Sequence, residues 1–206
     1  MKLAGNVYII AAASGSGKSS LAAELSKTMP DLVVSISHTT RPIKPGELDG
    51  KHYYFVTKEK FRELIDKGDF LEYAEVFGNY YGTSRKIVEK QLLSGKDLIL
   101  DIDWQGARLA RERLPCTSIF LLPPSMSELA LRLKSRKRDS DQVIAVRMSL
   151  ASKEISHYKE FDYVVINDKF EEALGDLQAI VRSKRLALAS QLARHHKLIA
   201  SFLKEA

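Results

Sequence analysis

Cysteine is almost absent from this sequence of 206 residues, which contains only Cys116. A single cysteine excludes a disulfide framework and a thiolate metal cluster, and it favours a buried, unreactive thiol in a reducing compartment. The five histidines are scattered and form no set of metal ligands. No segment approaches the roughly 18 apolar residues of a membrane-spanning helix. We therefore expect a cytoplasmic protein with no membrane partner.

An excess of one charge is also missing from most of the chain. The formal net charge is +6, from 32 Lys and Arg against 26 Asp and Glu. Five of these six net charges lie in residues 182–206, which hold six basic residues and one acidic residue. The remainder is close to neutral, so we expect no nucleic-acid partner. The hydrophobic content of 45% is sufficient for one core that carries inserted lobes.

The most informative segment is a short apolar strand that runs through a glycine turn into a helix. Gly15 and Gly17 can adopt backbone angles that let successive amide groups surround phosphate oxygens at the positive end of the helix dipole. Lys18 supplies a mobile cation for the outer phosphates, and the hydroxyl of Ser19 can ligate Mg²⁺. The segment predicts ATP binding by eight consecutive residues: Ala13, Ser14, Gly15, Ser16, Gly17, Lys18, Ser19 and Ser20.

A second strong pattern is the apolar strand that we expect at residues 97–103. Asp101 and Asp103 flank Ile102 at its C-terminal end. Buried parallel strands deliver acids in this way to a site at the edge of a sheet. Beside a phosphate-binding loop, such an acid orients the water shell of Mg²⁺. We expect Asp101 to act on the metal through this hydration shell.

The remaining periodicities predict alternating strands and helices, which indicate an α/β fold with a parallel sheet. We expect strands at 32–36, 52–56, 70–76, 118–122 and 163–168, a turn at 79–83, and helices at 20–29, 59–66, 85–93 and 104–114. From Lys169 we expect one helix to the end, with an apolar stripe that packs on the core or on a second subunit. The stripe consists of Leu174, Leu177, Val181, Leu188, Leu192, Ile199 and Leu203, and the run Arg194, His195, His196 and Lys197 is expected to be solvated.

Two segments interrupt this alternation. Residues 37–85 read as a small mixed lobe, and its first part is a polar, proline-stiffened stretch typical of a binding loop. Residues 126–156 are helical and basic, which fits a solvated face or a mobile lid whose arginines close over phosphates. The predicted core then comprises residues 1–36, 86–125 and 157–206.

Five motifs occur in order along the chain: Ser14–Ser19, Ser37–Arg41, Gly46–Glu47 with Asp49–Tyr53, Gly78–Thr83, and Asp101–Gly106. Together they make the chain resemble the guanylate kinase family, over about residues 6–185. The resemblance implies a P-loop nucleoside monophosphate kinase fold, in which helices flank a parallel sheet and the chain carries an inserted GMP-binding lobe and a helical lid. It also implies ATP as phosphoryl donor, GMP as acceptor and Mg²⁺ as cofactor.

The same resemblance implies the roles of individual residues. For GMP these positions are Arg41, Lys44, Tyr53 and Tyr81 at the phosphate, Ser37, Glu72, Thr83 and Asp103 around the guanine, and in addition Glu47 and Asp101. The implied catalytic residues are Lys18, Arg41, Arg136 and Arg147, with Arg132 in support and Asn167 near the ATP adenine. Guanine presents two adjacent N–H donors to one carboxylate, whereas adenine presents none, so this chemistry favours GMP over AMP.

The chain departs from the family pattern at three positions. It has Ala12, Lys44 and Lys137 where the family commonly has glycine, arginine and glycine. We expect Ala12 to be tolerated at the end of the strand with a negative φ. Lysine lacks the two-pronged geometry of a guanidinium group, so Lys44 predicts a weaker hold on GMP.

The reaction implied is ATP + GMP ⇌ ADP + GDP by direct in-line transfer, in purine nucleotide metabolism, and we expect dGMP to serve as well. One alternative is a kinase of a sugar phosphate on the same scaffold. Another is a non-catalytic interaction module, a class that typically loses the loop lysine or the acids, which are present here as Lys18, Asp101 and Asp103. The C-terminal stripe makes a homodimer a further expectation.

Overall fold

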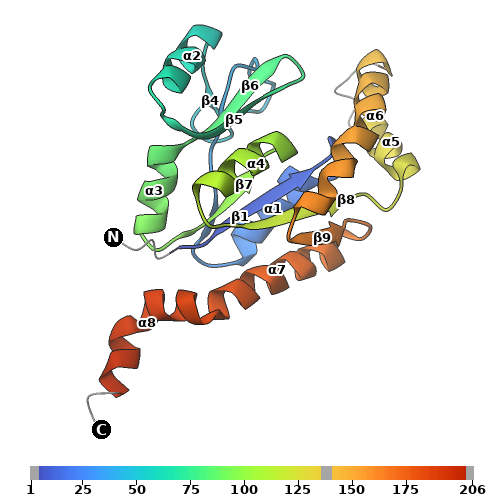
Figure 1. The fold of residues 1–206 in the computed structure, drawn as a ribbon. Coiled ribbons are helices and arrows are strands. Elements are labelled where there is room, and N and C mark those ends of the chain that lie inside the picture. Colours follow the sequence, from blue (N-terminus) through green and yellow to red (C-terminus); the bar gives the residue numbers. More distant parts are fainter. Residues whose placement is uncertain (1–4, 136–140, 203–206) are drawn as a thin grey trace.

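A parallel sheet forms the centre of the molecule in a computed structural model, which describes residues 5–135 and 141–202 (Figure 1). Its strand order is β2-β7-β1-β8-β9, and every neighbouring pair is parallel. The strands are β1 (Val7–Ala12), β2 (Leu32–Val34), β7 (Asp97–Asp101), β8 (Thr117–Leu122) and β9 (Tyr163–Ile166). The α/β class with a parallel sheet, as predicted, is confirmed, although β2, β7 and β9 end earlier than expected.

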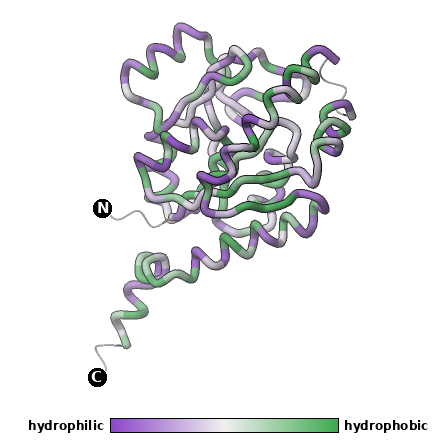
Figure 2. Tube along the Cα trace, turned by 45° about the vertical axis from the view of Figure 1, so that its right-hand side comes forward, coloured by the Kyte–Doolittle hydropathy of each residue, from purple (hydrophilic) through white to green (hydrophobic). Residues whose placement is uncertain are grey.

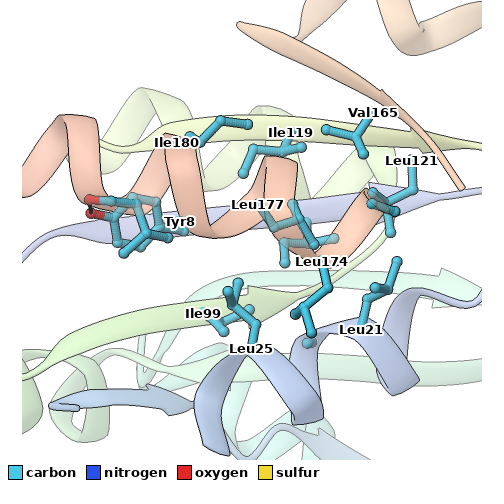
Figure 3. Packing of buried hydrophobic residues seen from close by; sticks show 14 of the residues in the cluster. Tyr8, Leu21, Leu25, Ile99, Ile119, Leu121, Val165, Leu174, Leu177 and Ile180 are labelled. Carbon is cyan, nitrogen blue, oxygen red and sulfur yellow. Dashed lines mark hydrogen bonds between the residues drawn. The ribbon is translucent and has the colours of Figure 1, made fainter. Parts of the chain in front are cut away.

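Helices cover both faces of this sheet because strand side chains alternate between the faces. Tyr8 and Ile10 point to the face covered by α1 (Lys18–Thr28) and α7 (Phe170–Leu186), where they join an apolar cluster (Figure 3). Val7 and Ile9 point to the opposite face, toward α3 (Arg85–Leu93) and α4 (Trp104–Arg113). The two clusters hold the strands rigidly, so that the loops following the strands are fixed in position.

A second sheet of four strands stands beside the first, and its strands fall within residues 37–85, the range predicted as a lobe. Its order is β4-β3-β6-β5, with β3 (His38–Thr39), β4 (Tyr54–Phe55), β5 (Phe70–Val76) and β6 (Asn79–Ser84), and α2 (Lys58–Asp66) accompanies it. The ring of Phe61 on α2 stacks on Phe70, with centroids 4.5 Å apart. This contact attaches α2 to the sheet.

The turn predicted at residues 79–83 is wrong, because these residues form strand β6. The turn lies just before them, at Phe77 and Gly78, which both have positive φ values of 50° and 75°. Two successive left-handed residues are typical of a tight hairpin turn. The composition of this segment is typical of a turn, but its pairing with β5 and β3 makes it a strand.

The segment predicted as a lid consists of α5 (Met126–Ser135) and α6 (Asp141–Ser156), followed by the short 3₁₀ helix η1 (His157–Glu160). Leu129 and Leu133 of α5 share a buried cluster with Ile144 and Ala151 of α6. Ala13 belongs to the same cluster, so the two helices pack directly against the glycine loop. Arg136 and Lys137 lie outside the described residues.

The prediction of one continuous C-terminal helix is wrong. Helix α7 ends at Leu186, and α8 (Leu188–Phe202) follows a break at Ala187, whose ψ of 140° is not helical. The stripe is divided accordingly: its residues on α7 are buried, whereas Leu188 and Leu192 on α8 are 74% and 40% exposed. Helix α8 extends away from the sheet (Figure 1), and hydrophobic positions recur along it (Figure 2). Leu203 lies outside the described residues.

Cys116 is partly buried beside the second apolar cluster. Burial raises the pKa of its thiol to about 11, so the group stays protonated at neutral pH and is a poor nucleophile, as the sequence indicated. No helix within residues 5–135 and 141–202 is long and apolar enough to span a membrane.

Candidate functional site

The glycine loop connects β1 to α1 at the carboxyl edge of the parallel sheet. Gly15 and Gly17 have φ values of 97° and 89°, and a Cβ on Gly17 would lie 2.5 Å from Nδ2 of Asn167. A side chain at position 17 is therefore excluded by backbone angle and by space. Nδ2 of Asn167 donates to the carbonyl of Ser16 at 2.7 Å, which ties the end of β9 to the loop. Ala12 pairs with Leu121 inside the sheet, and its φ is not positive, as expected.

Lys18, the first residue of α1, links the loop to the neighbouring strand β7. Its Nζ forms an ion pair with Asp101 and donates to the carbonyl of Ile102 at 3.1 Å. Ser19 is exposed in the first turn of α1, close in sequence to this pair. The structure therefore brings together the lysine and the acid that we predicted for phosphate and metal binding, and Ser19 follows Lys18 directly on α1.

Helix α6 contacts the loop at Ser14. Nη1 of Arg147 donates to Oγ of Ser14 at 3.1 Å, and Oε2 of Glu154 accepts from its backbone amide, also at 3.1 Å. Burial raises the pKa of Glu154, while the amide, Lys18 and Arg147 oppose this rise. Sequence reasoning predicted Arg147 here but missed Glu154, because an acid on a helix surface gives no signal of a partner that lies 140 positions away.

A cavity of about 240 Å³ lies beside the loop. Its lining residues are Gly15, Gly17, Ser20, Arg132, Ser135, Asn167, Asp168 and Phe170. Arg132 forms an ion pair with Glu128 at 2.8 Å and donates to the carbonyl of Asn167 at 2.9 Å. Arg132 thus shapes the wall of the cavity, which Asn167, the residue predicted near the adenine of ATP, also lines.

The residues predicted at the GMP phosphate gather in the lobe that contains the second sheet. Nη2 of Arg41 pairs with Oε1 of Glu47 at 2.8 Å, and the Arg41 guanidinium lies 5.4 Å from the ring centroid of Tyr53. The rings of Tyr53 and Tyr81 meet edge to face at 6.0 Å. Burial raises the pKa of Tyr53 to about 12, so its hydroxyl remains a hydrogen-bond donor. The side chain of Lys44 is exposed, and only its amide joins the group, by donating to Glu47 at 2.8 Å.

The residues predicted around guanine converge on a buried carboxylate. Glu72 on β5 is 2% exposed, and its Oε1 has no hydrogen-bond partner within the described part of the chain. It stands opposite Thr83 on β6, whose Oγ1 lies 3.5 Å from Oγ of Ser37. Burial raises the pKa of Glu72 to about 7; hydrogen bonding with Thr83 opposes this rise, and the nearby charge of Asp103 adds to it. A buried acceptor without a partner is costly unless a ligand supplies the donors.

Gly106 and Asp103 adjoin this carboxylate at the start of α4. A Cβ on Gly106 would lie 2.5 Å from Oε2 of Glu72, so a side chain at this position would require the carboxylate to move. Asp103 caps α4 by accepting the Gly106 amide at 2.9 Å. Asp103 therefore has a structural role in addition to the predicted one.

The other side of α4 is joined to η1. The indole of Trp104 stacks on the imidazole of His157, with centroids 3.6 Å apart and planes at 8°. Arg108 lies 4.9 Å over the same indole and forms two hydrogen bonds of 2.6 Å with Glu160. These contacts connect η1, which directly follows the predicted lid segment, to the helix that begins next to Asp103 and Glu72.

Known proteins resemble the chain over nearly its full length. A family model described as guanylate kinase matches residues 4–184. A guanylate kinase of Vibrio cholerae is 56% identical over 204 residues, covering 98% of this chain and 99% of the relative. The guanylate kinase of Escherichia coli K12 is 52% identical with the same coverage.

A solved structure supports the same conclusion. The crystal structure of guanylate kinase from Anaplasma phagocytophilum has a TM-score of 0.73 and 37% identity, and the match covers 89% of this chain and 88% of that one. This likeness confirms the predicted P-loop nucleoside monophosphate kinase fold. The chain belongs to the guanylate kinase family.

Proposed function

We propose that this protein transfers the γ-phosphoryl group of ATP to GMP in line, giving ADP and GDP, and that it accepts dGMP as well. The observation that carries the proposal is the buried carboxylate of Glu72, whose Oε1 has no partner among the described residues and which lies opposite Thr83, whose hydroxyl adjoins that of Ser37. This arrangement offers an acceptor to the N1–H and 2-amino groups of guanine and a hydroxyl to its O6. A sugar phosphate can offer hydroxyl donors to a carboxylate, but it lacks the adjacent carbonyl acceptor that guanine presents as O6.

In this mechanism the protein positions two polyanions and neutralises the charge between them. The GMP phosphate oxygen is already a nucleophile, so no covalent intermediate is required. Lys18 and the loop amides hold the phosphates of ATP, Arg41 with Tyr53 and Tyr81 holds the phosphate of GMP, and Arg147 stabilises the transferring group. Arg136 is assigned to the same task by family resemblance alone.

The residues at the edge of the sheet suit Mg²⁺. Ser19 and Asp101 offer oxygen atoms, which this ion prefers, and the structure shows no cluster of three or more His, Cys, Asp or Glu within its described ranges. Such a sparse set fits an ion held largely by substrate phosphates and water. When bound, Mg²⁺ neutralises charge on the phosphates of ATP.

The proposal also assigns parts of the chain to steps of the reaction. Residues 37–85, with their own sheet, close on GMP, and residues 126–156 close on ATP, against a core of residues 1–36, 86–125 and 157–206. Closure excludes water and prevents hydrolysis of ATP. The proposed setting is purine nucleotide metabolism in the cytoplasm, consistent with a lone, unreactive cysteine.

A coupled assay of GMP-dependent ADP formation, with GMP, dGMP and AMP measured in parallel, tests the function. We expect turnover with GMP and dGMP. The kcat/KM for AMP should be no more than about 10⁻⁴ of the value for GMP. Lys18→Ala should lose at least about a hundredfold in kcat with an unchanged circular dichroism spectrum. Binding of both nucleotides by calorimetry without turnover would favour the interaction module instead.

A homodimer through α8 is part of the proposal. Leu188, Leu198 and Phe202 are 74%, 56% and 66% exposed on this helix, and a second copy of the chain would cover them. Sedimentation of the full chain should show a dimer, and a chain truncated after Arg185 should be monomeric. The double variant Leu188→Ser/Leu198→Ser should also be monomeric while it retains Arg194. A monomeric full chain would contradict the dimer.

A further inference from the structure

We infer that Glu154 is a positioning residue for the phosphoryl donor, which holds the first turn of the glycine loop through the amide group of Ser14. The inference rests on the proposed reaction, since it assigns Glu154 to the ATP side of the site. Glu154 lies on α6, outside the glycine motif, whereas the loop leads into α1.

The argument begins with the geometry of α6. Arg147 and Glu154 are seven residues apart, about two turns of helix, so they lie on the same face. Both reach Ser14: Arg147 contacts its hydroxyl and Glu154 contacts its amide, each at 3.1 Å. Ala151 lies between them in sequence and is 1% exposed, in the cluster that contains Ala13. Helix α6 is thus attached to two consecutive loop residues by packing and by two hydrogen bonds.

The chemistry of the contact argues for a role toward the loop and against a role as a phosphate ligand. A carboxylate repels phosphate, so Glu154 cannot itself stabilise the polyanionic donor. It can accept a hydrogen bond from an amide, and such bonds to an ionised acceptor are about twice as strong as neutral ones. An amide committed to Glu154 fixes the peptide plane between Ala13 and Ser14. The orientation of the following amides, which are assigned to ATP phosphates, depends on that plane.

The position of Glu154 predicts different effects of a substitution on the use of ATP and on the use of GMP. Its contact is with the amide of Ser14 in the glycine loop, whereas Arg41 and Tyr53 lie in the lobe of residues 37–85. A change at Glu154 should therefore alter the use of ATP and leave the use of GMP largely unaffected. General damage to the fold would alter both.

Two substitutions and a matched control test the inference. Glu154→Ala removes the acceptor, whereas Glu154→Gln keeps a carbonyl oxygen of similar reach. Lys153→Ala alters an exposed neighbour on the same helix. We expect Glu154→Ala to raise the KM for ATP, and the Kd for ADP measured by calorimetry, by about tenfold, with KM for GMP within about twofold. Glu154→Gln should remain within about threefold of the wild type in every constant, and Lys153→Ala should match the wild type.

Three outcomes would overturn the inference: an unchanged Kd for ADP in Glu154→Ala, equal increases in the KM values for ATP and GMP, or a Gln variant as impaired as the Ala variant. The ADP titration needs no turnover, so it separates the two proposals. If the wild type binds ADP but forms none in the presence of GMP and ATP, the proposed function fails. A tenfold weaker ADP affinity in Glu154→Ala would still support the positioning role at the loop.

Discussion

Arg194 on α8 contacts the fully buried carboxylate of Asp97 at the start of β7, 97 positions earlier in the chain. Nε of Arg185 on α7 binds the other oxygen of Asp97 at 2.7 Å, and the amide of Asn6 donates at 2.7 Å. Two arginines from two helices thus neutralise one buried acid. The prediction that Arg194 is solvated is therefore wrong. This contact integrates α8 into the fold, although the family model ends at residue 184.

Arg194→Ala should lower the free energy of unfolding by about 1–3 kcal/mol, because it leaves a buried carboxylate with one guanidinium partner fewer. Denaturant unfolding measures the change. Lys197→Ala, at an exposed position on the same helix, is the control and should stay within about 0.5 kcal/mol of the wild type. Equal effects of the two substitutions would mean that the contact adds nothing to stability.

Gly106→Ala should raise the KM for GMP by about tenfold or more, because the added Cβ would lie 2.5 Å from Oε2 of Glu72 and must displace that carboxylate. The KM for ATP should not change. Gly175→Ala in α7 is a matched control, since no atom lies within 4 Å of its added Cβ. It should stabilise the protein by about 0.5–1 kcal/mol and leave both KM values unaltered. An unchanged KM for GMP in Gly106→Ala would remove Glu72 from the acceptor site.

The use of GMP should depend on the ionisation of Glu72. Only the ionised carboxylate accepts two donors from guanine, and burial raises its pKa to about 7. The kcat/KM for GMP should therefore fall as the pH decreases through 7 and reach a plateau above it. Glu72→Gln should lower kcat/KM by about a hundredfold or more and remove this part of the profile.

The phosphate of GMP also titrates, near pH 6 by analogy with phosphoserine. That ionisation contributes equally to the wild type and to Glu72→Gln, so the difference between their pH profiles isolates the carboxyl group. Identical profiles would show that Glu72 does not control the pH dependence.

Asp103→Ser should separate the two roles of Asp103. Serine caps helices about as well as aspartate, so the free energy of unfolding should change by only a few tenths of a kcal/mol. The shorter side chain does not reach as far into the guanine site, and the KM for GMP should increase about tenfold. Asp103→Ala is the comparison and should lose about 1 kcal/mol of stability as well. A normal KM in Asp103→Ser would leave Asp103 as a helix cap alone.

Local patterns predicted much of the fold and of the loop. The glycine turn, the lysine and the first turn of α1 follow one another in sequence, and α3 and β5 have the residues that we predicted. Each of these elements follows from a short-range sequence pattern: apolar periodicity, a glycine in a turn, or the signals of a helix start.

The errors arose where distant partners decide the structure. Asn79–Ser84 has the composition of a turn, and pairing with β3 and β5 makes it a strand. The break at Ala187 allows Arg185 and Arg194 to reach the same carboxylate. Ser14 and Glu154 are 140 positions apart, so no window of sequence contains both. The roles assigned to the site residues remain predictions for the experiments above.

The stacking of Trp104 on His157 provides an optical reporter that needs no label. The chain has one tryptophan, so its intrinsic tryptophan fluorescence comes from a single place: the contact of α4 with η1, which directly follows the segment proposed to close on ATP. Any movement that separates the two rings changes the emission of that indole. A closure that moves η1 relative to α4 should therefore be visible in real time by stopped-flow fluorescence of the unmodified protein.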